Sequence, residues 1–86
     1  AKPEYILGFE AFQRGDYRQA VARVNRAILL NPQYPTFYLL ASEIYIKLND
    51  LPRAREMVSR MDRLDTTLYP HDTQRAADIR RRLQTR

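Results

Sequence analysis

The sequence predicts an all-α fold in which two helical hairpins stack on each other and a C-terminal helix caps the stack. Apolar residues recur at helical spacing in five segments, and turn-forming residues separate these segments. A spaced pattern of small and apolar residues begins at Glu4 and recurs, in weaker form, from Tyr38, which gives a period of about 34 residues. The 86 residues suffice for a single small domain, residues 1–86.

The first hairpin is predicted from its turn residues. We expect a helix over about residues 3–14, because a proline in the first turn loses no hydrogen bond. Gly15 ends that helix by adopting the left-handed conformation. Asp16 then caps a second helix over about residues 17–30. The Asn-Pro pair at 31–32 ends it, because the residue before a proline avoids the helical region.

The second hairpin repeats this plan with different turn residues. A third helix is expected over about residues 35–48, again opened by a proline. Asn49 stands where the first hairpin has glycine, and asparagine is the next best residue for a left-handed turn. Asp50 caps a fourth helix over about residues 51–64, which tolerates Pro52 in its first turn.

A fifth helix is predicted over about residues 72–84, within a C-terminal segment of residues 72–86. Ala76, Ile79 and Leu83 form its apolar stripe. The preceding connection is longer than the other turns, so this helix is free to pack at a different angle. It is either a cap that shields the last hairpin or the first helix of a third repeat. Arginines cover much of its remaining surface: Arg75, Arg80, Arg81, Arg82 and Arg86.

The recurring pattern combines a small pair in the first helix of each hairpin with spaced small residues in the second. Its first occurrence comprises Leu7-Gly8, Gly15-Asp16-Tyr17, Ala20, Val24, Ala27 and Pro32. Its second comprises Ala41-Ser42, Tyr45, Asn49-Asp50-Leu51, Ala54, Val58 and Met61. This pattern resembles the tetratricopeptide repeat, with repeat one over about residues 3–34 and repeat two over about residues 35–67. Repeat two departs from it at Thr66, where the family has a closing proline.

The resemblance implies a right-handed stack of two tetratricopeptide-like hairpins. It also implies a non-enzymatic protein-interaction module that acts as an adaptor, a chaperone or an assembly scaffold. The small residues permit close helix packing, Gly8 against Ala20 and Ser42 against Ala54. Larger side chains are expected to fill the core. They are Leu7, Tyr17, Val24, Ile28, Tyr38, Tyr45, Leu51 and Val58.

The first helix carries more apolar surface than this core needs. Tyr5, Phe9 and Phe12 follow i, i+4, i+7 spacing on a face separate from the small pair. In the family this face lines a concave groove, to which the third helix contributes from Thr36 onward. The candidate groove residues, apolar ones first, are Tyr5, Phe9, Phe12, Leu39, Ile46, Gln13, Glu43 and Lys47.

We expect this groove to bind an apolar segment of a partner protein, as a helix or an extended peptide. Two other occupants stay open, namely the fifth helix or a neighbouring repeat, and a second copy of the chain. A separate hypothesis makes the chain a self-assembling building block that stacks end to end through its fifth helix, because two repeats are few for a stable stack.

Catalytic, cofactor-binding and metal-binding residues are not expected, and we predict that the chain is not an enzyme. Cysteine is absent, and the single histidine, His71, is expected to be a solvated residue of a loop and not a catalyst or a metal ligand. One subclass of the family holds the C-terminal carboxylate of chaperone tails in a lysine–asparagine clamp. The matching positions are Tyr5, Phe9 and Leu40, so we do not expect chaperone tails as ligands.

The formal net charge is +5, with nearly all of the positive charge on arginine, and such a charge can favour acidic partners, membranes or nucleic acid. Arg75, Arg80, Arg81 and Arg82 could form a basic surface on the fifth helix. We do not expect nucleic acid, because aspartates are interspersed there and no nucleic-acid motif is present. No apolar run approaches the roughly 20 residues of a membrane span. We therefore expect a soluble protein, and the bacterial cytoplasm and periplasm are both compatible with the sequence.

Overall fold

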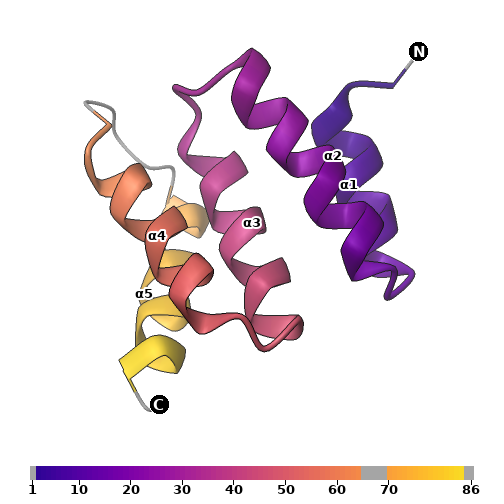
Figure 1. The fold of residues 1–86 in the computed structure, drawn as a ribbon. Helices are drawn as coiled ribbons and strands as arrows, with labels where there is room; N and C mark the ends of the chain where they lie inside the picture. The colour runs from indigo at the N-terminus through magenta and orange to yellow at the C-terminus, as the bar shows by residue number, and fades with distance from the viewer. Residues whose placement is uncertain (1, 65–69, 85–86) are drawn as a thin grey trace.

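The computed structural model of the chain describes residues 2–64 and 70–84. Over these residues it is all-α, as predicted, and contains five helices. They are α1 (Glu4–Gln13), α2 (Tyr17–Leu30), α3 (Pro35–Lys47), α4 (Leu51–Asp62) and α5 (Pro70–Gln84). Figure 1 shows α1 and α2 as one hairpin, α3 and α4 as the next, and α5 behind α4. None of the helices in the described ranges is long and apolar enough to cross a membrane.

The two hairpin turns adopt the conformations predicted from their residues. Gly15 has a φ of 82° and Asn49 a φ of 59°, so both lie in the left-handed region. Asp16 and Asp50 follow as the N-caps of α2 and α4. Each carboxylate accepts a hydrogen bond of 3.4 Å from the backbone N–H three residues later. The bounds of α2 agree with the prediction because cap and stop signals flank both of its ends.

Replacing Asn49 with alanine is expected to destabilise the domain by about 1 kcal/mol, because the left-handed conformation costs an ordinary side chain roughly 1–2 kcal/mol. Asn49→Gly should leave the free energy of unfolding unchanged or raise it, since glycine adopts this conformation without steric cost. Urea denaturation followed by helical circular dichroism measures both. Equal stabilities of the alanine and glycine variants would show that this backbone angle does not limit the turn.

The start of α5 corrects one prediction. The helix begins at Pro70, so His71 lies in its first turn and not in a loop. A proline fits this position because the first helical N–H groups have no partner within the helix. The end of α4 also comes two residues before the predicted end. Two further predictions concern Thr66 and Arg86, and both residues lie outside the described ranges.

The core confirms the close approach expected within the first hairpin. A Cβ atom placed on Gly8 would lie 2.5 Å from Val24 Cγ2 and 3.2 Å from the Ala20 carbonyl oxygen. Ser42 has no exposed surface, and its hydroxyl donates to the Leu39 carbonyl at 2.8 Å. Of the eight large residues predicted for the core, four are buried: Val24, Ile28, Tyr38 and Val58. The other four are only partly buried: Leu7, Tyr17, Tyr45 and Leu51.

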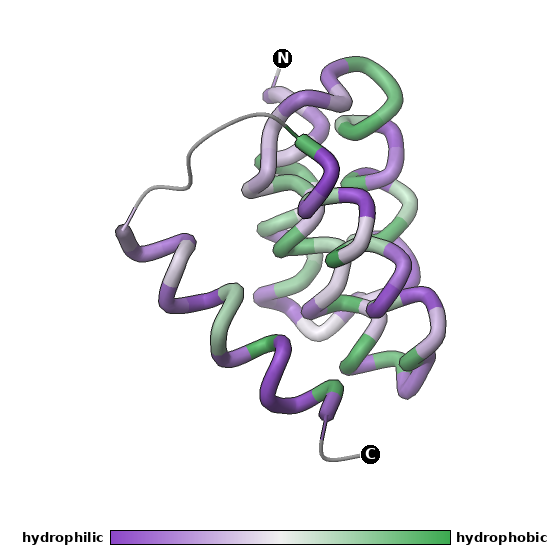
Figure 2. Tube along the Cα trace, turned by 90° about the vertical axis from the view of Figure 1, so that its left-hand side faces the viewer, coloured by the Kyte–Doolittle hydropathy of each residue, from purple (hydrophilic) through white to green (hydrophobic). Residues whose placement is uncertain are grey.

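The apolar stripe of α5 is buried against the second hairpin. Ala76, Ile79 and Leu83 are 1%, 2% and 7% exposed. α5 contacts α3 more extensively than α4, whereas α3 itself packs mainly on α2 and α4. The fifth helix therefore lies further toward α3 than a regular repeat would place it, and Figure 2 shows it running diagonally along one side of the molecule.

This placement favours a cap over the first helix of a third repeat. Ala76 holds the position in α5 that Ser42 holds in α3 and Gly8 in α1, each one repeat length after the last. In α1 that position faces the second helix of its own hairpin, because Gly8 packs on α2. In α5 the same position is already buried against the preceding helices. The burial of α5 is thus that of a capping helix.

Candidate interaction surface

Two equivalent helix faces, on α1 and α3, differ in their surroundings. The side of α1 directed away from α2 carries Ile6, Phe9 and Gln13 at i, i+3 and i+7, and we call it the inner face of α1. Ile6 and Phe9 are each 38% exposed. Their equivalents one repeat length later are Leu40 and Glu43 on α3. Leu40 has no exposed surface, and Glu43 is bound by a residue of α5.

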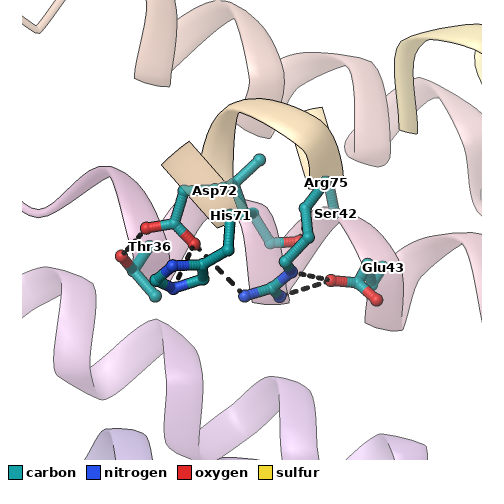
Figure 3. Close-up of polar contacts among 7 residues, drawn as sticks. Thr36, Ser42, Glu43, His71, Asp72 and Arg75 are labelled. Carbon is teal, nitrogen blue, oxygen red and sulfur yellow. Dashed lines mark hydrogen bonds and ion pairs between the residues drawn. The ribbon is translucent and has the colours of Figure 1, made fainter. Parts of the chain in front are cut away.

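The first turns of α5 cover the α3 face through polar contacts. The hydroxyl of Thr36 donates to Asp72 Oδ2 at 2.8 Å. Arg75 donates from Nε to Glu43 Oε1 at 3.2 Å, and its Nη2 contacts the same oxygen. Figure 3 shows the carboxylate of Asp72 between Thr36 and Arg75, and the guanidinium of Arg75 directed at Glu43. These contacts fix the beginning of α5 on α3.

Asp72 is the most deeply buried charged residue in the described part of the chain, with 1% exposure. Besides Thr36, its carboxylate has Arg75 Nη1 and His71 Nε2 at 3.5 Å each. Burial by itself lowers the pKa of Arg75, but the hydrogen bond and charge of Glu43 outweigh it, and the pKa is raised. A buried carboxylate is therefore compensated by a guanidinium that stays protonated.

The aromatic residues predicted for the groove are partly used within the chain. The ring of Tyr5 stacks on Phe37 with centroids 4.9 Å apart, and Phe37 meets Tyr34 edge-on at 5.2 Å. Burial raises the pKa of the Tyr5 hydroxyl, and the positive charge of Arg75 only partly opposes this. Phe12 packs against Tyr17 at 5.7 Å. Of the three predicted aromatics, Phe9 is exposed, whereas Tyr5 and Phe12 are partly buried.

Leu39 was expected in the groove, but it is fully buried in the core. It is the repeat-two equivalent of Tyr5. The ring of Tyr5 contacts the first helix of the next hairpin, α3, by stacking on Phe37. The corresponding neighbour of Leu39 is α5, which closes over α3. Glu43 is likewise engaged by α5, and Ile46 packs partly against the core. Gln13 and Lys47 are exposed, and Ile6, which was not among the predicted groove residues, belongs to the same surface as Phe9.

The arginines of α5 do not form the predicted surface as a set. Arg75 is directed inward at Glu43 and Asp72. Arg80 contacts Asp62 of α4, and Arg81 contacts Asp78 one turn earlier. Arg82 is exposed. Because nearby carboxylates offset these charges, the positive field that α5 presents to a phosphate backbone is reduced.

The hypothesis of end-to-end assembly relied on the apolar stripe of α5. Ile79 and Leu83 are buried inside the chain and offer little surface to a second copy. The exposed side of α5 is instead mostly polar. Within the described residues, no group of three or more metal-ligating side chains is positioned to hold a metal ion.

Comparison with known proteins identifies the family of the chain. A family model described as a tetratricopeptide repeat matches residues 11–82, from within α1 to within α5. The match thus covers most of the chain, including α5. No curated protein and no solved structure matches the chain.

Proposed function

Because the chain belongs to the tetratricopeptide repeat family, we propose that it is a non-enzymatic adaptor or scaffold that binds an apolar partner segment on the inner face of α1. Repeats of this family generally mediate protein–protein interaction. One observation carries the proposal: α5 covers the inner side of α3, while the equivalent side of α1 leaves Ile6 and Phe9 exposed.

The inner face of α1 has the chemistry of a small recognition surface. Ile6 and Phe9 lie one helical turn apart, so a single apolar side chain of a helical or extended segment can contact both. Gln13 lies one turn further along and offers an amide for hydrogen bonds to a peptide backbone. Lys47 on α3 is exposed and adds a positive charge to which a carboxylate can be drawn.

Replacing Phe9 with glutamate is expected to lower capture of the partner at least tenfold, because the variant places a charge in the apolar contact, an expected loss of roughly 1.4 kcal/mol or more. The measurement is affinity capture from extracts of the cells that make the protein, with quantitative mass spectrometry. Since Phe9 is 38% exposed, the variant should keep its helical circular dichroism.

The matched control is Leu30→Glu, which makes a comparable apolar-to-acidic change at a residue that is 68% exposed at the end of α2. A protein captured by the wild type and by Leu30→Glu, but lost with Phe9→Glu, would be the partner of the inner face. Equal capture by all three baits would refute the assignment of this face. Capture of further copies of the chain alone would point to self-association.

A further inference from the structure

A second hollow surface runs between α2 and α4, on side chains that the inner face does not use. It consists of two neighbouring hollows of about 370 and 510 Å³ that share Tyr45 and Arg53. The Nδ2 of Asn25 donates to the Tyr45 hydroxyl at 3.2 Å and links α2 to α3 there. We call this surface the outer furrow, defined by Arg18, Asn25, Leu29, Arg53, Met57 and Arg60.

One end of the outer furrow is apolar. Leu29 is 82% exposed, the highest value among the large apolar side chains described. It borders the hollow together with Ile28 and Met57, which are 2% and 6% exposed and lie in the core. A single exposed leucine is ordinary on a protein surface. Here the leucine stands beside a hollow with an apolar lining, where an inserted side chain would contact it and the methionine at once.

The charge along the furrow is predominantly positive. Arg18, Arg53 and Arg60 line it, and the guanidinium of Arg60 lies 5.2 Å from the centroid of the Tyr38 ring, which restricts its position. Two carboxylates also border it. Asp50 caps α4 and is bound by Arg53, so these two charges offset each other, although the Arg53 side chain is 69% exposed. Arg18 and Arg60 then remain against Glu56, and the net charge of the furrow is positive. The complementary surface therefore carries carboxylates.

We propose that the outer furrow docks an acidic amphipathic helix of a partner protein. A leucine-like side chain of this helix fills the hollow beside Leu29, and its flanking carboxylates contact Arg18, Arg53 and Arg60. A second copy of the chain is a poorer occupant, because each copy has a formal net charge of +5. Nucleic acid is also a poorer occupant, because its phosphates make no favourable contact with the apolar end and are repelled by the carboxylate of Glu56.

The test uses the ¹⁵N-labelled chain and a synthetic 18-residue helical peptide with leucines on one face and glutamates flanking them. A peptide with every glutamate replaced by lysine is the control ligand. We expect the acidic peptide to shift the amide signals of Asn25, Leu29 and Arg53, and the lysine peptide to cause no shifts there. The affinity should fall at least tenfold between 50 and 300 mM NaCl, because exposed ion pairs are screened.

Two variants separate the charged and apolar parts of the furrow. The double variant Arg18→Glu/Arg53→Glu is expected to weaken binding of the acidic peptide at least tenfold. Both residues lie in first turns of helices, where glutamate suits the helix dipole and the fold should persist. Leu29→Gln should weaken binding about three- to tenfold. The matched double variant Arg14→Glu/Arg63→Glu makes the same charge change outside the furrow and should bind as the wild type does.

Three results with the peptides would overturn the proposal: equal binding of both peptides, no shifts at 1 mM acidic peptide, or shifts confined to the inner face of α1. A 12-nucleotide single-stranded RNA is the remaining comparison. If this RNA bound more tightly than the acidic peptide, and Arg18→Glu/Arg53→Glu abolished that binding, the furrow would belong to nucleic acid and the proposal would fail.

Discussion

Arg75→Met is expected to lower the free energy of unfolding by about 3 kcal/mol, the lower end of the cost of removing one partner from a buried ion pair. The variant would remove the guanidinium from beside the Asp72 side chain, which is 2% exposed, and leave the Thr36 hydroxyl and the solvent-exposed His71 next to it. We place the loss at the lower end because the Arg75 side chain is 32% exposed, so water can partly replace it. Urea denaturation at pH 7, followed by circular dichroism, measures the loss.

A double-mutant cycle tests whether the loss arises from the orphaned charge. Asp72→Asn removes the charge but keeps an oxygen that can accept from Thr36. The double variant Arg75→Met/Asp72→Asn should therefore be more stable than Arg75→Met alone. The control is Arg81→Met, which removes an arginine whose side chain is 70% exposed and should change stability by less than about 0.5 kcal/mol. A cost below about 1 kcal/mol for Arg75→Met would mean that this ion pair does not fix α5.

The hairpins could be predicted because their signals are local. Gly15 and Asn49 each mark a turn within a few residues of the helix that it ends, and each is followed by an aspartate that caps the next helix. The repeat period then identifies which small residues meet across a hairpin, as Gly8 does with α2. None of these inferences depends on how one hairpin packs against the next.

The position of α5 could not be predicted in this way. Its stripe of Ala76, Ile79 and Leu83 shows which side of the helix is buried, but not whether α3, α4 or another chain covers it. The contact that decides this joins Arg75 to Glu43, 32 residues apart, and both residues read as surface charges in the sequence. A pairing at that separation leaves no periodic signal.

The candidate site was also predicted incompletely, because its surroundings depend on the position of α5. Glu43 was assigned to the groove because it is the equivalent of Phe9, and that equivalence is correct in register. The surroundings of the two residues differ because only the α3 face has α5 beside it. Ile6, in contrast, could have been found, because it stands three residues before Phe9 on the same helix. The i, i+3 spacing of Ile6 and Phe9 is as evident in the sequence as the i, i+4, i+7 spacing of Tyr5, Phe9 and Phe12.

Gly8→Leu is expected to cost about 3 kcal/mol or more, because the α1–α2 contact has no room for a side chain. Even the first added atom, Cβ, would lie 2.5 Å from Val24 Cγ2 and 3.2 Å from the Ala20 carbonyl oxygen. Val24 has no exposed surface and a stiff branched side chain, so it cannot turn away without displacing its neighbours. Native stability is only about 0.05–0.15 kcal/mol per residue, so this loss should greatly lower the urea midpoint.

The control for size is Ala22→Leu, which enlarges an exposed residue on α2 and should change stability by less than about 0.5 kcal/mol. Gly8→Ala combined with Val24→Ala tests the contact itself. Alanine at position 8 gains up to roughly 1 kcal/mol in helix propensity but meets the Val24 methyl group. Removing that methyl group should therefore make Gly8→Ala less costly, with a coupling of about 0.5–3 kcal/mol. Additive effects would mean that the helices move apart freely, in which case glycine is not required for their close approach.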